Sequence, residues 1–386
     1  MKFVPTPITA LLLSIGAGIP VGPFIPETGM KGVLFIKQVS GQIIFFLVPL
    51  IIIGFVASSI VSLKRSVSRL IVFAFSLAYL SSVGAAFFAM AVGYQVMPLP
   101  DIQPATKIPE ELPEVLFHLE IPPMSSVMSS LVFSILIGPG CIWTKSEKVA
   151  ELLLQFREIV LGLVRHVLIP LLPLYVATNF CSLSYEGDIS RLGIFLPVIL
   201  IAVACHCLWL FLLYGLSTLY SGKNSWQILR FYFPAYFTAL GTMSSAATLG
   251  VALKCADKSP ILDKRISNFS IPLYANIHLC GSVLTEVLFV CVIAQLLYGR
   301  LPESSTLVLF IVLLGVFAVG APGVPGGTVL SSLGIVVSVL GFDDASTAML
   351  IAIFALQDSF GTACNITGDG ALTLMTDTFS KRHCKI

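Results

Sequence analysis

The sequence has 386 residues, of which 56% are hydrophobic and 11% are charged, and its formal net charge is +2. Soluble domains carry about 25% charged residues, so this composition excludes an ordinary soluble protein and indicates a polytopic membrane protein. No basic run marks a nucleic-acid-binding surface, so we expect no nucleic-acid partner.

The first 223 residues contain six apolar segments, each long enough to cross a bilayer core of roughly 30 Å. The N-terminal segment resembles a secretory signal, but Pro20, Pro23 and Pro26 crowd the region where a cleavage site would lie, so we interpret it as the first span. The six predicted segments are 6–25, 34–62, 68–96, 122–143, 150–182 and 190–220.

Basic residues predict the orientation, because cytoplasmic loops carry an excess of lysine and arginine. One cluster, Lys64, Arg65 and Arg69, lies between the second and third segments, and another, Lys381, Arg382 and Lys385, follows the last one. We therefore expect both termini in the cytoplasm. The loop 97–121, rich in proline and acidic residues, is expected outside.

Two later segments, 226–255 and 304–341, are interrupted in the middle. The first contains Gly-Thr-Met-Ser-Ser-Ala-Ala-Thr at 241–248, and the second contains Gly-Ala-Pro-Gly-Val-Pro-Gly-Gly-Thr at 320–328. Glycine and proline at this density end a helix, and irregular backbone at membrane depth is tolerated where protein buries it or where it lines a cavity. The pattern favours two helical hairpins with polar tips, as in transporter binding sites. The alternative for 304–341 is a surface loop that joins two full spans.

Segment 268–298 carries polar residues at membrane depth. Its apolar run is broken by Asn-Ile-His-Leu-Cys-Gly-Ser at 276–282. A single histidine such as His278 serves core structure as often as function. Glu286 is a stronger functional candidate, because burial disfavours the charged form of a carboxylate and makes it a plausible proton carrier.

The last segment, 345–377, has one polar face. Asp358, Thr362, Asn365 and Asp369 are spaced at i, i+4, i+7 and i+11, which places them on one side of a helix at about 100° per residue. Carboxylates at membrane depth cost roughly 2.5 kcal/mol or more each, and they usually face a cavity, an ion or a partner. The stripe therefore predicts a solute or ion site, and the alternative is a buried polar network that only joins helices.

The cysteine and histidine residues show no pattern that predicts a transition-metal site. The nine cysteines lie mostly in apolar runs and form no paired framework. The sequence Cys205-His206-Cys207 lies within an apolar span, and no second ligand pair has zinc-site spacing, so we expect no metal there. No nucleophile–base pair stands at useful spacing, so we do not expect an enzyme.

Three of these motifs, in this order, resemble the dicarboxylate/amino acid:cation symporters, the glutamate-transporter family. They are Ser244-Ser245-Ala-Ala-Thr248, the Gly/Pro stretch 320–328, and Asp358…Thr362…Asn365-Ile-Thr-Gly-Asp369. The resemblance implies an all-α polytopic membrane protein with eight transmembrane helices, two re-entrant hairpins and inverted repeats. Helices one, two, four and five would form a trimer scaffold.

The remaining helices and both hairpins would form a transport domain that moves vertically against the scaffold. The implied division is 1–223 for the first six spans, of which helices three and six join the transport domain, 224–378 for the transport core and 379–386 for a cytoplasmic tail. The core would comprise hairpin one (226–255), helix seven (268–298), hairpin two (304–341) and helix eight (345–377). The chain is expected in a bacterial-type inner (plasma) membrane.

The resemblance also implies roles for individual residues. Asp358 would bind the α-amino group of an amino acid, and Asn365 would contact both the substrate and a cation. Cation ligands would be Asn365, Asp369 and His278. Hydrogen bonds to the substrate would come from Ser244, Ser245, Thr362 and the backbone at Val324, and Gly323, Pro325 and Gly326 would form the gate. No organic cofactor is expected; the coupling ion would be Na⁺ and/or H⁺.

Several departures from the family pattern shape the expected function. Family members with acidic substrates carry an arginine where Gly361 or Met243 stands, so a neutral small amino acid is favoured over a dicarboxylate. The helix-seven motif Asn-Met-Asp-Gly-Thr is replaced by His278-Leu279-Cys280-Gly281-Ser282, which removes oxygen ligands for sodium.

A further feature points to protons. Glu286 stands where proton-countertransporting members have a glutamate, so we expect protons to take part in coupling. Two alternatives stay open: a proton- or sodium-coupled symporter for dicarboxylates or acidic amino acids, and a diverged member that leaks ions or transports nothing.

Overall fold

The computed structural model describes residues 7–58, 61, 69–96, 113, 120–185, 195–321 and 326–383, and this part of the chain contains helices and no strands. The first half comprises α1 (Pro7–Val21), η1 (Gly22–Phe24), α2 (Glu27–Ile52), η2 (Ile53–Ala57), α4 (Arg69–Val96), α5 (Val127–Trp143), α6 (Glu147–Leu163), η4 (Val164–Leu168), α7 (Ile169–Tyr185) and α8 (Phe195–Ser221). The second half comprises α9 (Trp226–Thr242), α10 (Ser245–Asp257), α11 (Lys264–Ile277), α12 (Cys280–Tyr298), α13 (Ser304–Gly320), α14 (Gly327–Ser338) and α15 (Asp344–His383).

Six helical stretches in the described part of the chain are long and apolar enough to cross a membrane. They are Glu27–Ala57, Arg69–Val96, Glu147–Ser182, Leu196–Ser221, Lys264–Tyr298 and Asp344–His383. Each overlaps a predicted segment, and the prediction of a multi-pass membrane protein is thereby confirmed. The other two predicted spans among the first six, 6–25 and 122–143, contain the shorter helices α1 and α5.

The two interrupted segments form pairs of short helices. Helices α9 and α10 have 17 and 13 residues, and α13 and α14 have 17 and 12 residues. At about 1.5 Å per residue these helices are roughly 18 to 26 Å long, which is less than the bilayer core. The members of each pair pack against one another. Met243, directly after the last residue of α9, has a left-handed φ of 52°. Ser244 is the N-cap of α10, and its side chain accepts a hydrogen bond from Ala247 N at 3.2 Å.

The segment predicted as 268–298 is two helices. The chain leaves the helical conformation at His278 and Leu279, between α11 and α12. His278 N still donates the last helical bond of α11, to Tyr274 O at 2.8 Å, but Leu279 N donates to another helix, to Ser82 Oγ of α4 at 3.3 Å. The polar interruption in this segment therefore corresponds to a real break in the backbone.

The last helix, α15, is continuous and longer than predicted. It runs for 40 residues, from Asp344 to His383, so it begins one residue before the predicted 345–377 and includes residues 379–383 of the predicted tail. Lys381, Arg382 and His383 occupy its final turn, where positive charge is favourable for the helix dipole. Most of its side chains from Ser346 to Ser380 are buried.

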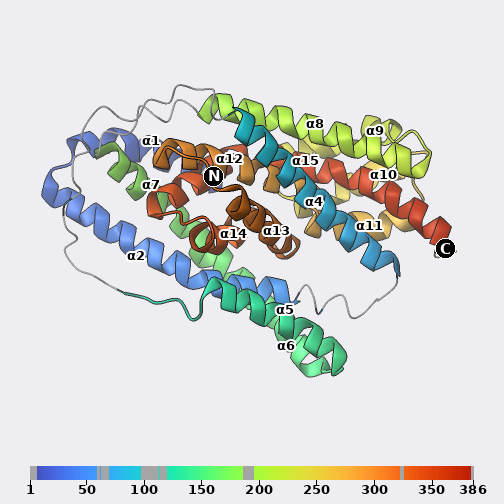
Figure 1. Cartoon of the computed structure of the whole chain (residues 1–386), viewed down its shortest axis with the longest axis horizontal. Helices are drawn as coiled ribbons and strands as arrows, with labels where there is room; N and C mark the ends of the chain where they lie inside the picture. Colours follow the sequence, from blue (N-terminus) through green and yellow to red (C-terminus); the bar gives the residue numbers. More distant parts are fainter. Residues whose placement is uncertain are drawn as a thin grey trace, which may run out of the picture.

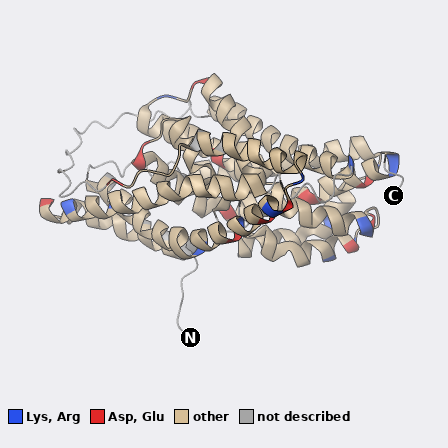
Figure 2. Ribbon diagram, turned by 90° about the horizontal axis from the view of Figure 1, so that it is seen from below, with Lys and Arg blue, Asp and Glu red and all other residues tan. Residues whose placement is uncertain are grey.

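Helix α15 lies at the centre of one group of helices. It packs against α8, α9, α11 and α12, and α4 packs along α12 and α13. Helices α2, α5 and α6 lie along the opposite side of the molecule, with α1 and α7 packed together (Figure 1). Charged residues are sparse on the ribbons, and several lie near helix ends, including the C-terminal end of α15 (Figure 2).

Candidate functional site

One small cavity lies where the interrupted helices meet the middle of α15. Its lining comes from the α9–α10 turn, the α11–α12 break, the facing ends of α13 and α14, and α15. Its volume is about 20 Å³, which is room for one or two water molecules. The predicted substrate-binding residues that the structure describes all line it, namely Ser244, Ser245, Asp358, Thr362 and Asn365. Val324, Gly323 and Pro325 lie outside the described residues.

Asp358 of α15 caps the N-terminus of α14. Its Oδ2 accepts a hydrogen bond of 2.7 Å from Gly326 N, and Gly326 has a left-handed φ of 73°, which suits glycine. The first N–H groups of a helix lack intrahelical partners and carry partial positive charge, so they favour a carboxylate. Asp358 is only 5% exposed, and its Oδ1 accepts no hydrogen bond from any described residue. This oxygen is available to a ligand in the cavity.

Two hydroxyl groups line the same cavity. Ser245 and Thr362 are 6% and 5% exposed, and neither hydroxyl has a hydrogen-bond partner in the described part of the chain. Buried polar groups are usually hydrogen-bonded, and exceptions often face an unseen ion, water or ligand. Together with Asp358 Oδ1, they give the cavity one negative acceptor and two groups that can donate or accept.

Asn365 caps the first turn of α12. Its Oδ1 accepts hydrogen bonds from Gly281 N at 2.7 Å and Ser282 N at 3.3 Å, and its Nδ2 donates to Ser282 Oγ at 2.9 Å. These bonds satisfy N–H groups at the start of α12, directly after the break. Asn365 thus holds the broken helix against α15 in addition to lining the cavity.

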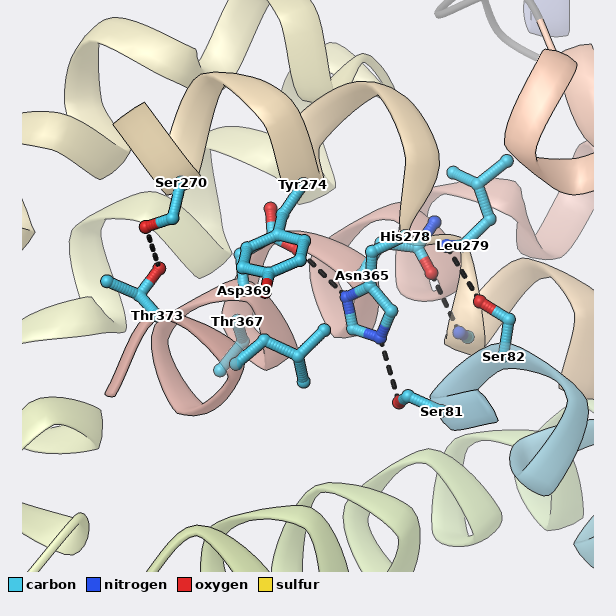
Figure 3. A network of polar contacts seen from close by, with 12 residues as sticks. Ser81, Ser82, Ser270, Tyr274, His278, Leu279, Asn365, Thr367, Asp369 and Thr373 are labelled. Atoms are coloured by element: carbon cyan, nitrogen blue, oxygen red, sulfur yellow. Dashed lines mark hydrogen bonds and ion pairs between the residues drawn. The ribbon is translucent and has the colours of Figure 1, made fainter. Parts of the chain in front are cut away.

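Asp369 and His278 form a buried pair beside this cap (Figure 3). His278 Nδ1 lies 2.8 Å from Asp369 Oδ1, and His278 Nε2 lies 2.9 Å from Ser81 Oγ of α4. Both His278 and Asp369 are 0% exposed. The two predicted cation ligands therefore contact each other directly.

Glu286 belongs to a separate network. It is fully buried on α12, and Ser332 Oγ of α14 donates a hydrogen bond to its Oε1. Its other oxygen, Oε2, has no hydrogen-bond partner among the described residues. The contact of Glu286 leads to α14, whereas those of His278 lead to α4 and α15.

None of the described residues that line the cavity is lysine or arginine. Met243 lines the cavity with an uncharged thioether side chain. Gly361 packs against α12, because a Cβ built there would lie 3.4 Å from Ser282 Cα. A ligand with a second carboxylate would find no guanidinium at either position, so the site lacks the bidentate partner that such a group favours.

Several residues that contact the break between α11 and α12 were not predicted from the sequence. Ser81 and Ser82 of α4 contact His278 and Leu279, which lie 197 positions away in each case. His206 of α8 places Nε2 at 3.0 Å from Gly281 O and from Thr285 Oγ1, so it serves α12 as a hydrogen-bonding partner. The only signal for the serine pair was two adjacent hydroxyls inside an apolar span.

Fold and site together define a class of protein. Helices that break at membrane depth around a shared polar cavity, with a carboxylate at a half-helix N-terminus, are the architecture of secondary transporters. The comparison with known families agrees: the model of the Sodium:dicarboxylate symporter family matches residues 7–379. The chain belongs to this family, as its motifs predicted, and its apolar helices make it a multi-pass membrane protein.

Several similar proteins are animal proteins named as transporters. The chain is 28% identical to human Excitatory amino acid transporter 2 over 274 residues, which are 68% of this chain and 46% of that protein. It is 27% identical to the bovine Excitatory amino acid transporter 3 over 264 residues (67% and 49%) and to bovine Excitatory amino acid transporter 1 over 286 residues (72% and 52%). The matches thus span about half the length of these relatives.

Proposed function

We propose that this protein is a secondary active symporter that moves a small amino acid across the membrane together with Na⁺ and/or H⁺. A neutral amino acid is favoured over an acidic one. The observation that carries the proposal is Asp358, a buried carboxylate with one oxygen at the α14 N-terminus and the other without a described partner. It lies in a cavity whose described lining includes no basic side chain.

The α-amino group of the substrate would pair with Asp358. A buried carboxylate needs a hydrogen-bonded cation or strong donors, and an ammonium supplies both. The substrate carboxylate would take hydrogen bonds from Ser245, Thr362 and backbone N–H groups at the hairpin tips, since helix N-termini favour anions. Ser244, which also lines the cavity and caps α10, would hold the tip in place.

The missing arginine supports a neutral side chain. An acidic substrate would bring a second carboxylate beside Asp358, with no cationic partner among the lining residues that the structure describes. An unpaired charge in a desolvated site costs at least about 1–3 kcal/mol. This penalty would weaken aspartate or glutamate relative to serine or alanine.

Transport would follow an elevator mechanism. In this proposal α9–α10 and α13–α14 are re-entrant hairpins, because the short helices of each pair pack against one another and the end where they meet lines the cavity. They would move with α4, α8, α11, α12 and α15 against a scaffold of α1, α2 and α5–α7. The family resemblance adds a homotrimer, a bacterial-type inner membrane and cytoplasmic termini. Lys381 and Arg382 in the last turn of α15 support a cytoplasmic C-terminus, because cytoplasmic ends of spans are rich in basic residues.

Protons would enter the cycle through Glu286. This residue is fully buried, and Ser332 of α14 provides its one described hydrogen bond, so movement of the second hairpin would change its surroundings. The carboxylate could then take up a proton in one state and release it in the other. Uptake driven by sodium alone and unchanged by Glu286→Gln would contradict this role.

The deciding experiment is uptake into proteoliposomes that contain the purified protein. A sodium gradient and a proton gradient are imposed separately, and alanine, serine, aspartate and succinate are compared. We expect saturable accumulation of alanine or serine. Accumulation of aspartate or succinate in their place would refute the assignment of a neutral substrate.

The second candidate function is symport of dicarboxylates or acidic amino acids. It is favoured by the name of the family and by the relatives, which are named as excitatory amino acid transporters. Tight binding of aspartate, with weak binding of alanine, would establish it. A conductance without accumulation of any solute would instead support an ion-leak protein.

A further inference from the structure

A chain of hydrogen bonds crosses three helices at the break between α11 and α12. Figure 3 shows Ser81 of α4, His278 at the break and Asp369 of α15 in one row. The imidazole lies between the two others, with Nε2 at 2.9 Å from Ser81 Oγ and Nδ1 at 2.8 Å from Asp369 Oδ1. His278 and Asp369 are fully buried, and Ser81 is 7% exposed.

The chemistry of the groups sets the direction of the Asp369 bond. An ionised carboxylate only accepts hydrogen bonds, so Nδ1 of His278 is the donor to Asp369. Nε2 meets a hydroxyl, which can donate or accept, so Ser81 satisfies the ring whichever form it takes. Both nitrogens of the imidazole are thus used, and the ring orientation is determined by α4 and α15 together.

The imidazole is also held by packing. A Cβ built on Gly368 would lie 2.8 Å from His278 Cε1, so the absent side chain at Gly368 makes room for the ring. The ring of Tyr274 meets His278 edge-on, with centroids 6.3 Å apart. The side chain therefore fills the space beside Asp369 and leaves no gap between the two residues for an ion.

The donors at this place do not suit a sodium ion. Hard cations take several oxygen ligands, whereas nitrogen and sulfur suit softer metals. Asp369 Oδ1 is occupied by His278, which leaves Oδ2 as its only carboxylate oxygen without a described partner. Cys280, next in the chain after Leu279, contributes a thiol, whose Sγ lies 3.5 Å from a Cβ built on Gly368.

We propose that His278 takes the place of a sodium ion at Asp369 and so prevents this site from coupling transport to sodium. Family membership implies a sodium site somewhere in the chain, and Asp369 is its strongest carboxylate candidate. Here a side chain of the protein itself meets that carboxylate. His278 is then a determinant of ion specificity at this site.

Sodium binding by purified protein tests the proposal without transport. The melting temperature is measured in sodium chloride and in choline chloride at equal ionic strength, because a ligand that binds the folded state stabilises it. The natural chain should show no sodium-specific shift that depends on Asp369. His278→Asn, alone or combined with Cys280→Asp, offers oxygen ligands and should acquire a sodium-specific rise that Asp369→Asn removes. His278→Gln offers the same amide oxygen if the asparagine variant does not fold.

His206→Asn is the matched control. His206 is also buried and contacts the first turn of α12, but its bonds go to Gly281 and Thr285 and not to Asp369. This variant should remain as indifferent to sodium as the natural chain.

Two results would overturn the proposal. One is a sodium-specific rise in the natural chain that Asp369→Asn abolishes, and the other is a folded set of His278 variants that never respond to sodium. The proposal rests on the proposed symport only in its consequence for coupling. Failure of amino-acid uptake would refute that function and leave the ion-binding result intact.

Discussion

Replacing Asp358 with asparagine removes its charge and keeps its shape. The amide oxygen of asparagine can still accept the hydrogen bond that Gly326 N donates to Asp358 Oδ2 at 2.7 Å. The start of α14 therefore keeps its cap, and only the favourable charge at the helix N-terminus is lost, which costs about 0.3–1 kcal/mol. We expect the variant to fold and to retain the cavity.

Ligand binding should suffer much more than folding. A hydrogen bond to a charged group contributes about 1.5–3 kcal/mol. Since about 1.4 kcal/mol changes affinity tenfold, loss of the ammonium–carboxylate contact should weaken an amino acid about 10- to 150-fold. Asp358 is 5% exposed, so solvent screening reduces this effect little.

The assay compares two ligands on two proteins. Alanine and lactate differ in having an ammonium or a hydroxyl beside the carboxylate, and their affinities are measured for the natural chain and for Asp358→Asn. The natural chain should prefer alanine, and the variant should lose this preference while its affinity for lactate changes little. Asp257→Asn is the control, because Asp257 is 39% exposed and pairs with Lys264 at 3.4 Å, away from the cavity lining. Equal loss of both ligands, or unchanged alanine binding, would refute the assignment of Asp358 to the amino group.

Three further substitutions test other parts of the site. Glu286→Gln keeps a hydrogen-bond acceptor and removes the exchangeable proton, so proton-driven uptake in proteoliposomes should be abolished while the melting temperature stays close to that of the natural chain; unchanged proton-driven uptake would exclude the role. Gly361→Arg should raise the affinity for aspartate relative to alanine at least about tenfold, since a charge-assisted hydrogen bond exceeds 1.4 kcal/mol. Direct binding of both amino acids to the purified variant measures this ratio, and an unchanged ratio would contradict the prediction. Gly368→Ala brings a Cβ to 2.8 Å from His278 Cε1 and should destabilise the fold by about 1–3 kcal/mol in thermal unfolding. Gly250→Ala meets open space on α10 and should be neutral or stabilising by up to about 1 kcal/mol, so equal effects of the two alanines would contradict the packing argument.

The long helices were predictable because each corresponds to a long apolar run in the sequence. Runs such as 68–96 and 190–220 predicted α4 and α8 to within a few residues, since a helix in lipid must be apolar along its whole length. The turn between α9 and α10 was also predictable from the sequence. Ser244 accepts the hydrogen bond from Ala247 N that a serine N-cap usually makes.

The break in segment 268–298 was visible only as a change in composition. Polar residues at 276–282 indicated an interruption, but a helix can contain a histidine and a serine without breaking. The helix is interrupted because groups from elsewhere take over its hydrogen bonds: Ser82 accepts from Leu279 N, and Asn365 accepts from Gly281 N. Such partners lie in other helices, and nothing in the local pattern points to them.

The sequence predicted that the polar residues of α15 share one face of the helix. It did not predict that each of them contacts a different part of the protein. Helical spacing placed Asp358, Asn365 and Asp369 on one face, and the structure gives each a different neighbour: α14, α12 and His278. Periodicity determines which side chains share a face. It does not determine which other helix approaches that face, because this depends on packing across the whole core.

Three buried carboxylates argue against a purely structural role for the polar core. Asp358, Asp369 and Glu286 each have one oxygen bonded to a described partner and a second oxygen that accepts no described hydrogen bond. Each unsatisfied buried acceptor costs about 1–3 kcal/mol, and a buried charge without a partner costs more. A core that served only to hold helices together would be more stable with apolar residues of similar volume at these positions. Glu286 Oε2 and Asp369 Oδ2 are fully buried acceptors of this kind, and Asp358 lines the cavity, which is a costly arrangement for a scaffold. They suit a transport core in which ammonium, cation or proton binds for part of the cycle and leaves again.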